Sequence, residues 1–459
     1  MTSRVNPFFT VSPLPYQTPP FDLIQEEDFL PALEAGIEEK RQEVTAIASN
    51  SEPATFANTY EALERCGQLL KRVNMVFGAM TSANTSDRLQ EIDELITPKL
   101  TALSDEIHLN SQLFSRLDNV YQHRGSQCPD AEAMRLVEVT WQQFQLAGAS
   151  LNNTDKERLR ACNQELATLS TRFGNKLLAA TKAGAYTVSS PVALAGLSEE
   201  ELAHAKAAAE ARGLSGEWLL PLQNTTQQPA LQSLEVRATR EALFDQALTR
   251  SEQGDDNDTR AIVLRMAQLR AQQANLLGFN TYAEWSMQDQ MAKTPDAAFS
   301  FMRNIGPAAR ARAEREAADI QQAIEQQHHS FTLRAWDWSF YAEQVRKAKY
   351  ALDESQIRPY FELNSVLERG VFWSASQLFG IRFQQRHDLP VYHPDVIVFE
   401  IFDADDTPLA LFYTVLYKRD NKSGGARSGE RRVGQESRPR VSRYTLKKNI
   451  HVTHIPECL

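Results

Sequence analysis

Residues 336–341, Trp336-Asp337-Trp338-Ser339-Phe340-Tyr341, open the stretch that decides the fold of this 459-residue chain. The stretch continues through residues 360–363 (YFEL) and 370–373 (GVFW), and it ends with residues 418–426 (KRDNKSGGA). Three of the six tryptophans fall between residues 336 and 373. Because large aromatic side chains contribute strongly to protein cores, we expect this stretch to form a densely packed core segment.

The composition is typical of a globular protein, with 42% hydrophobic and 24% charged residues. The formal net charge of −10 argues against a nucleic-acid-binding protein, because such proteins normally carry a basic face. The charge is unevenly placed. Residues 427–459 hold eight Lys and Arg against three Glu, so the acidic balance belongs to the residues before them.

The cysteines form no C-x-x-C pair, and four in this length do not suggest a disulfide framework. We expect small buried thiols in a reducing compartment. Residues 1–24 are rich in proline and hold no apolar run of signal-peptide length. No stretch reaches the roughly 18 apolar residues that span a bilayer. The sequence therefore predicts a cytoplasmic protein without a membrane partner. The cysteines are Cys66, Cys128, Cys162 and Cys458.

A mainly α-helical bundle is the predicted fold class. After an extended arm over residues 1–24, the pattern is helical to about residue 330. Residues 154–157 (TDKE), and Ser198 with Glu201, match the capping box, in which a hydroxyl and a glutamate satisfy free backbone N–H groups at a helix start. Apolar residues then recur every three or four positions, which predicts one buried stripe on the first of these helices. The stripe consists of Leu159, Cys162, Leu166, Leu169, Phe173 and Leu177.

Two places interrupt the helical pattern. Residues 217–222 (EWLLPL) are short and apolar, which suggests a strand or a tight excursion. Residues 396–402 (VIVFEIF) and 409–417 are richer in β-branched and aromatic side chains, and an Asp/Thr/Pro cluster separates them. These two runs predict a β-hairpin within residues 390–417. Because both are apolar at nearly every position, we expect part of the hairpin to be buried on both faces.

The chain resembles the zinc-dependent thimet-oligopeptidase family and, within it, the bacterial peptidyl-dipeptidases (dipeptidyl carboxypeptidases). The resemblance is carried by the stretch from Trp336 to Ala426 and by residues 218–226 (WLLPLQNTT), 260–265 (RAIVLR) and 276–284 (LLGFNTYAE). It covers nearly all of residues 1–426. It implies a neurolysin-like, mostly helical molecule of two lobes, with a deep channel that admits short unfolded peptides.

The resemblance also implies a division of the chain. We expect residues 1–24 to be the extended arm and residues 25–330 a helical lobe. Residues 331–426 correspond to the start of the catalytic lobe, which is incomplete here. Residues 427–459 have no counterpart in the family and form a basic tail that we expect to be disordered. We interpret the tail as translated adapter or vector sequence, with a natural frameshift and an evolved basic tail as the alternatives.

The intact family uses one zinc ion, held by two histidines four residues apart in an H-E-x-x-H helix, with the glutamate as general base. None of the nine histidines here is followed by glutamate, and no two lie four residues apart. The inverted H-x-x-E-H order is absent as well. We therefore predict no catalytic, cofactor-binding or metal-binding residue in this chain, and no zinc bound to it.

Weaker candidates have structural explanations. We interpret His328-His329 as a solvated helix end, and His387 and His393 as polar residues of a loop before the hairpin. The aspartates at 403, 405 and 406 lack the glycine and bidentate glutamate of a calcium loop, so we assign them to a hairpin turn. Residues 423–425 (SGG) are interpreted as a loop. The donors His451, His454 and Cys458 in the tail are not expected to form a site.

Two hypotheses follow for function. In the first, the chain is the N-terminal part of a cytoplasmic zinc metallopeptidase that releases C-terminal dipeptides from oligopeptides, and it is inactive because the zinc motif is missing. In the second, it is a non-catalytic helical module that binds a peptide or protein. If the lobes of the family share a core, truncation exposes apolar surface such as the faces of residues 396–402, so we expect poor solubility.

Overall fold

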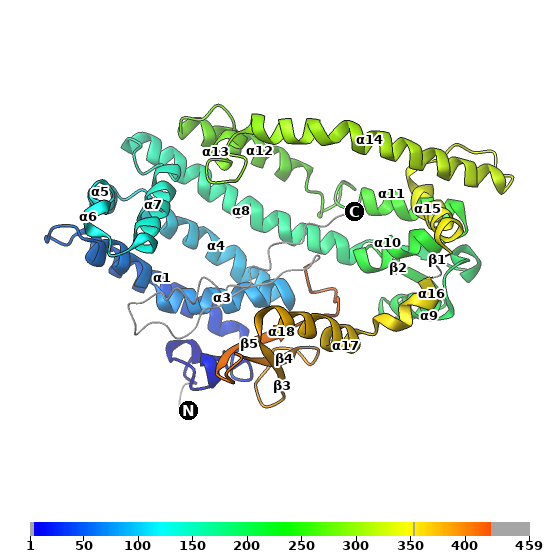
Figure 1. Ribbon diagram of the computed structural model, residues 1–459, viewed down its shortest axis with the longest axis horizontal. Helices are drawn as coiled ribbons and strands as arrows, with labels where there is room; N and C mark the ends of the chain where they lie inside the picture. The colour runs from blue at the N-terminus through cyan, green and yellow to red at the C-terminus, as the bar shows by residue number, and fades with distance from the viewer. Residues whose placement is uncertain (1–3, 352–353, 424–459) are drawn as a thin grey trace.

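The computed structural model describes residues 4–351 and 354–423, and helices predominate in this part of the chain (Figure 1). Strands form two small antiparallel sheets, one of two strands and one of three. The predicted mainly α fold with a small sheet near residues 390–417 is therefore confirmed. Within the described ranges, none of the helices combines the length and the apolar character that a membrane span requires.

The first seven helices enclose the largest hydrophobic core. Phe29 is buried in this core, with its ring 5.1 Å from that of Phe8 and 5.3 Å from that of Phe77. Two of these helices approach so closely that a Cβ atom at Gly36 would lie 2.7 Å from the backbone of Leu70, so this position requires glycine. The helices are α1 (Phe29–Ala48), α2 (Ala62–Arg65), α3 (Gln68–Ala83), α4 (Asp87–His108), α5 (Ser111–Gln122), α6 (Arg124–Gln127) and α7 (Ala131–Leu146).

The long helix α8 (Asn153–Ala183) does not begin with the predicted capping box at Thr154. Its N-cap is Asn152, whose Oδ1 accepts a hydrogen bond from the backbone N–H of Asp155 at 3.0 Å. The Asn152 side chain also donates to the Asp155 carboxylate at 2.8 Å. Because Asn152 caps a helix that already begins at Asn153, Thr154 lies inside the first turn.

Helix α8 packs against α4 and against α12 (Arg260–Leu276). The predicted stripe is buried at Leu159 and Cys162, and the rest of it is half-buried. The stripe is therefore a core face only in the first third of the helix.

The two-stranded sheet pairs β1 (Ala185–Val188) with β2 (Trp218–Pro221). The run at residues 217–222 is thus a strand, while its partner β1 was not predicted. The capping box at Ser198 is confirmed, because Glu201 accepts a hydrogen bond from the Ser198 backbone at 2.8 Å and donates its own backbone N–H to the Ser198 hydroxyl. The helices around this sheet are α9 (Glu199–Ala211), α10 (Asn224–Ser233) and α11 (Arg237–Leu248).

The opening stretch of aromatic residues forms α15 (Ala335–Tyr350). Its Tyr341 packs against Ile320 and Ile324, which lie near the end of α14 (Pro295–Gln326). Figure 1 shows α14 as a long helix along the upper edge of the molecule. The short helix α13 (Tyr282–Ser286) precedes it.

The three-stranded sheet has the order β3-β4-β5, with β4 in the centre. The predicted hairpin is confirmed, and its turn contains the three aspartates, with the Asp403 N–H donating to the Thr407 carbonyl at 2.9 Å. The edge strand β3 was not predicted, because its sequence RFQQR is mostly polar. The elements here are α16 (Glu354–Ile357), α17 (Leu363–Val366), α18 (Trp373–Phe379), β3 (Arg382–Arg386), β4 (Ile397–Phe402) and β5 (Pro408–Thr414).

Strand β4 is buried on both faces, as predicted. Val398 and Glu400 on one face and Phe399 on the other are each at most 9% exposed. The expectation that residues 396–402 expose apolar surface in this chain is therefore wrong. Phe399 packs against Leu367 and Phe372, and the Val398 face packs against residues of the β3–β4 loop.

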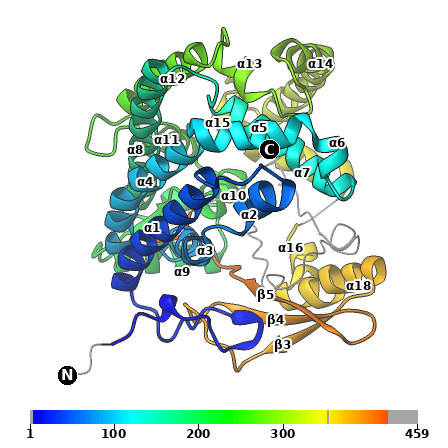
Figure 2. The same cartoon turned by 90° about the vertical axis from the view of Figure 1, so that its left-hand side faces the viewer.

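The N-terminal arm covers this sheet (Figure 2). The Tyr16 hydroxyl donates to the Glu400 carboxylate at 2.8 Å, and the Phe21 ring packs edge-on against Tyr392 and Tyr413. Tyr16 and Gln17 both adopt the left-handed backbone conformation, with φ angles of 56° and 52°. This conformation is uncommon for residues other than glycine. The arm thus joins the sheet to the core of the first seven helices.

Candidate functional site

The histidines of the described part do not converge. His328 and His329 follow the end of α14 and are exposed, as predicted. His387 is exposed in the β3–β4 loop, and His393 in the same loop accepts a hydrogen bond from the Asp395 backbone at 3.1 Å. Both are therefore loop residues, as interpreted from the sequence. His451, His454 and Cys458 lie outside the described residues.

The family resemblance implies a zinc ion, which would need a group of His, Cys, Asp or Glu side chains as ligands. Among residues 4–351 and 354–423, no group of three or more His, Cys, Asp or Glu side chains is placed to hold a metal ion. Zinc in proteins takes three or four such donors. The described residues therefore do not fit a zinc site, and no catalytic step through zinc is derived from them.

The described cysteines are not nucleophiles. Cys66, Cys128 and Cys162 are free thiols, of which Cys162 is buried and the other two are half-buried. Burial raises the pKa of Cys66 to about 11 and raises the pKa of the other two as well. Because the thiolate is the reactive form, all three are unreactive thiols at neutral pH.

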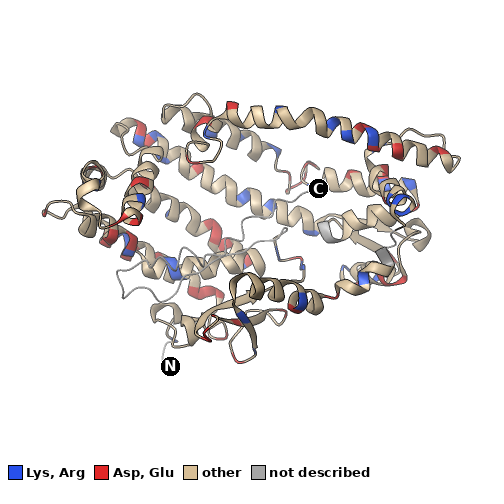
Figure 3. Cartoon of the chain, viewed as in Figure 1, with Lys and Arg blue, Asp and Glu red and all other residues tan. Residues whose placement is uncertain are grey.

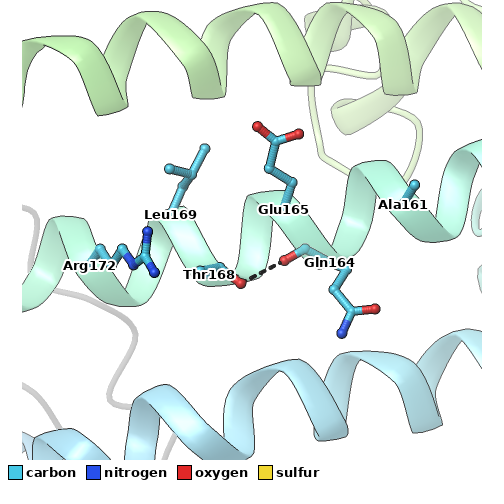
Figure 4. A pocket seen from close by; sticks show the side chains of 6 residues that line it. All are labelled: Ala161, Gln164, Glu165, Thr168, Leu169 and Arg172. Atoms are coloured by element: carbon cyan, nitrogen blue, oxygen red, sulfur yellow. Dashed lines mark hydrogen bonds between the residues drawn. The ribbon is translucent and has the colours of Figure 1, made fainter.

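A hollow of about 440 Å³ lies along the middle of α8 and is lined by residues of this helix (Figure 4). In Figure 4 the side chains of Glu165 and Leu169 point to the opposite side of the helix from Gln164. A smaller hollow beside it is shared with Glu94 and Pro98 of α4. The lining residues of the larger hollow are Ala161, Gln164, Glu165, Thr168, Leu169 and Arg172.

The side chains that line this hollow are mostly polar. Glu165 forms a two-point ion pair with Arg265 of α12, with distances of 2.6 and 2.7 Å. The hydrogen bonds from Arg265 lower the pKa of Glu165, so its carboxylate is a weak base at neutral pH. The Thr168 hydroxyl donates to the backbone carbonyl of Gln164 within its own helix. The lining therefore offers polar groups to a ligand but no activated nucleophile.

A buried ion cluster fixes the opening stretch of the chain. The Asp337 side chain is completely buried and accepts hydrogen bonds from Arg237 at 2.9 Å and from Arg240 at 3.1 Å. Arg240 is itself 1% exposed and donates to the carbonyls of Leu234 and Glu235. Because both arginines belong to α11, the cluster locks α15 onto α11. The role of the cluster is structural, because the Asp337 carboxylate is held between the guanidinium groups of Arg237 and Arg240.

The segment over residues 418–423 connects the sheet to two distant parts of the helical region. The backbone carbonyl of Asn421 accepts from Thr85 at 3.0 Å, between α3 and α4, and Asp420 accepts from Gln223 at 2.6 Å. Burial lowers the pKa of Lys418 and of Lys422. The Lys418 ammonium donates to the backbone carbonyl of Arg419 at 2.7 Å, and that of Lys422 donates to the carbonyl of Tyr417 at 3.1 Å. Ser423 is a loop residue as interpreted, while residues 424–425 lie outside the described residues.

Comparisons with known proteins show what this chain is similar to. The model of the family described as "Peptidase family M3" matches residues 230–453. The chain is 54% identical over 427 residues to "Dipeptidyl carboxypeptidase" of Escherichia coli (strain K12), covering 93% of this chain and 63% of that relative. These matches show that the chain is similar to peptidase family M3. The same-named protein of Salmonella typhimurium is 53% identical, over 95% of this chain and 64% of its own length.

A second group of relatives is more distant. "Oligopeptidase A" of Escherichia coli is 29% identical over 92% of this chain and 62% of that relative. The resemblance read from the sequence is thus confirmed at the level of the family. The chain spans less than two thirds of the length of the relatives that it matches. The predicted division at residues 25–330 and 331–426 stays a prediction, and the tail at 427–459 lies outside the described residues.

Sequence reasoning did not find the Asp337 cluster or the hollow on α8. The one local signal for the cluster is an aspartate between Trp336 and Trp338, at the start of a predicted aromatic core segment. Its arginine partners lie 97 and 100 residues earlier in the chain, so no short motif contains them.

Proposed function

We propose that this chain derives from a zinc metallopeptidase of family M3 that hydrolyses oligopeptides and releases C-terminal dipeptides. The release of dipeptides is proposed because the sequence identity to one group of relatives is much higher than to the other. The chain is 54% identical to a relative called dipeptidyl carboxypeptidase and 29% identical to one called oligopeptidase A, over nearly the same residues. The proposed substrates are short unfolded peptides with a free C-terminus, and the cytoplasm is the proposed place of action.

We further propose that the 459 residues alone do not catalyse this reaction. An H-E-x-x-H helix supplies two zinc ligands and the general base of such a peptidase, and the 459-residue sequence contains no such motif. The described residues contribute instead to the framework. Their polar hollow on α8 is a candidate wall for peptide binding, because its lining offers hydrogen-bonding groups without a reactive one.

A chimera tests the proposed specificity. Residues 1–423 are joined to the part of the Escherichia coli dipeptidyl carboxypeptidase that lies beyond its match to this chain. The substrates are an N-terminally blocked tetrapeptide with a free C-terminus and the same peptide as its C-terminal amide. We expect release of the C-terminal dipeptide from the free acid, and loss of turnover when a chelator removes zinc.

Three results bear on the alternatives. Equal cleavage of the amide contradicts dipeptide release from a free C-terminus and favours an internal peptidase. Absence of hydrolysis, in a chimera that is folded and binds the tetrapeptide, supports the non-catalytic binding module instead. Zinc-dependent hydrolysis by the 459-residue polypeptide without the added part contradicts the proposal that it is inactive alone.

A further inference from the structure

Two lysines, Lys418 and Lys422, lie together in the segment that connects the sheet to the helices, and we call them the lysine pair. The Lys418 ammonium donates to the backbone carbonyls of Arg419, at 2.7 Å, and of Lys422. The Lys422 ammonium donates to the carbonyls of Tyr417, at 3.1 Å, and of Val415. An ammonium group has three N–H donors. Each lysine therefore keeps one N–H group without an acceptor among residues 4–351 and 354–423.

The carboxylates around the lysine pair are held by other groups. Asp395 forms an ion pair with Arg419 at 3.2 Å, and His393 lies 3.5 Å from the same carboxylate. Asp420 accepts a hydrogen bond from Gln223 at 2.6 Å. Within the described part of the chain, neither ammonium group of the pair has a carboxylate as its partner. Arg419 and the lysine pair are three cations against these two carboxylates, so one positive charge has no counter-ion.

The lysine pair is also partly removed from water. Both side chains are half-buried. Burial lowers the pKa of both ammonium groups, and the positive charge of Arg419 lowers it further. Hydrogen bonds to backbone carbonyls could also be made by uncharged amides, so holding this segment does not by itself require two charged groups. A nearby negative charge would favour the charged form of both lysines, which indicates a site for an anion.

The position of the segment leaves room for a ligand between different parts of the fold. In Figure 3 the segment is the thin ribbon with blue stretches that rises from the sheet toward the middle of the molecule. It contacts Thr85 between α3 and α4, and Gln223 before α10. An anion on the lysine pair would therefore lie between the sheet and two separate groups of helices.

We propose that the lysine pair binds a carboxylate of a peptide through the remaining N–H group of each lysine. A carboxylate has two oxygens, so it can accept one hydrogen bond from each ammonium group. Such charge-assisted hydrogen bonds are stronger than those between neutral groups. The ligand class rests on the proposed function, in which short peptides are the substrates. The carboxylate can belong to the C-terminus of the peptide or to an acidic side chain, because both present the same group.

Binding of three peptides to the 459-residue chain tests this inference. The peptides are N-acetylated trialanine with a free C-terminus, its C-terminal amide, and N-acetylated alanyl-glutamyl-alanine amide. Isothermal titration calorimetry at low salt measures their affinities. We expect at least one of the two acids to bind at least tenfold more tightly than trialanine amide. Preference for the free C-terminus or for the glutamyl side chain identifies the source of the carboxylate. Equal affinity for all three peptides, or no binding, overturns the proposal.

A double substitution tests the two lysines themselves. Lys418→Gln with Lys422→Gln removes both charges and keeps amide groups that can donate to the same carbonyls. We expect this variant to bind the preferred acid at least tenfold more weakly. The matched control is Lys347→Gln with Lys349→Gln, which removes the same charge from two exposed lysines of α15 and should bind as the original chain does. An equal loss in both variants would assign the effect to net charge and overturn the proposal.

A second measurement on the unaltered chain applies even if the double variant does not fold. Lysines are acetylated with acetic anhydride, and mass spectrometry gives the rate at each position. With the preferred acid at saturation, we expect acetylation of Lys418 and Lys422 to slow at least threefold and that of Lys347 to stay unchanged. Trialanine amide should protect none of them. Acetylation of the lysine pair at the same rate with and without the acid overturns the proposal.

Failure of this inference can be distinguished from failure of the proposed function, because neither measurement requires hydrolysis. Binding of an acid to the lysine pair, together with a chimera that hydrolyses no peptide, supports this inference and counts against the proposed function alone. A chimera that releases dipeptides, together with no binding at the lysine pair, overturns this inference alone.

Discussion

Asp337→Ala removes the carboxylate that two arginines share at the contact of α11 with α15. The Asp337 side chain is completely buried, and that of Arg240 is 1% exposed. The substitution therefore leaves a buried guanidinium group without its counter-charge, stacked 4.3 Å from the ring of Phe340. Arg237 also loses its partner, but its side chain is 34% exposed and reaches water.

The magnitude follows from this difference between the two arginines. Removing one partner of a buried ion pair typically costs about 3–5 kcal/mol, because the remaining charge stays desolvated. Arg240 keeps its two hydrogen bonds to backbone carbonyls, which offsets part of this cost. We therefore expect a loss of about 3 kcal/mol in the free energy of unfolding, at the lower end of that range.

Urea unfolding followed by tryptophan fluorescence measures this loss, since Trp336 and Trp338 flank the substituted residue. The matched control is Glu316→Ala, which breaks an exposed i,i+4 ion pair with Arg312 on α14. We expect the control to leave the unfolding midpoint unchanged, because exposed ion pairs contribute little. An Asp337→Ala protein whose midpoint coincides with that of the control would refute the assignment of the cluster as the lock between α11 and α15.

Three further predictions concern single side chains. Burial raises the pKa of the Asp105 carboxyl to about 6, so this carboxyl stays protonated to a higher pH in the folded protein than in the unfolded chain. As the pH rises from about 4 to 6, Asp105 therefore destabilises the folded state increasingly. Asp105→Asn should therefore stabilise the protein by roughly 3 kcal/mol at pH 8, and the gain should vanish below pH 4 in urea titrations. Tyr16→Phe removes the hydrogen bond to buried Glu400, and hydrogen exchange over residues 4–24 should become faster; unchanged exchange contradicts the role of the arm. Asn152→Ala should cost about 1 kcal/mol and Thr154→Ala much less, and the reverse order in urea unfolding would restore the capping box predicted at Thr154.

Features fixed by neighbouring residues were predictable from the sequence. The helix after Ser198 was placed correctly, because its capping interactions lie within four residues. The β4–β5 hairpin was also found, since both strands are apolar and a polar turn joins them. The start of α8 was missed because two possible caps, Asn152 and Thr154, lie two residues apart and only geometry distinguishes them.

Features fixed by distant residues were not predictable. Strand β3 is polar and owes its conformation to pairing with β4, which no property of its own sequence indicates. Phe372 and Trp373 are adjacent aromatic residues, yet one is 8% exposed and the other 59%. Both are apolar in the sequence, and only the packing distinguishes the core residue from the exposed one. The resemblance to the family could be recognised because many residues carry it, whereas the hollow on α8 has no sequence motif.

Zinc content and peptide hydrolysis, measured together on the 459-residue polypeptide, test the central claim most directly. The purified protein is incubated with zinc, passed through a desalting column and assayed by elemental analysis and with a blocked tripeptide that has a free C-terminus. The account predicts far less than one zinc ion per chain and no release of dipeptide. One tightly held zinc ion per chain, together with dipeptide release that a chelator abolishes, would contradict it.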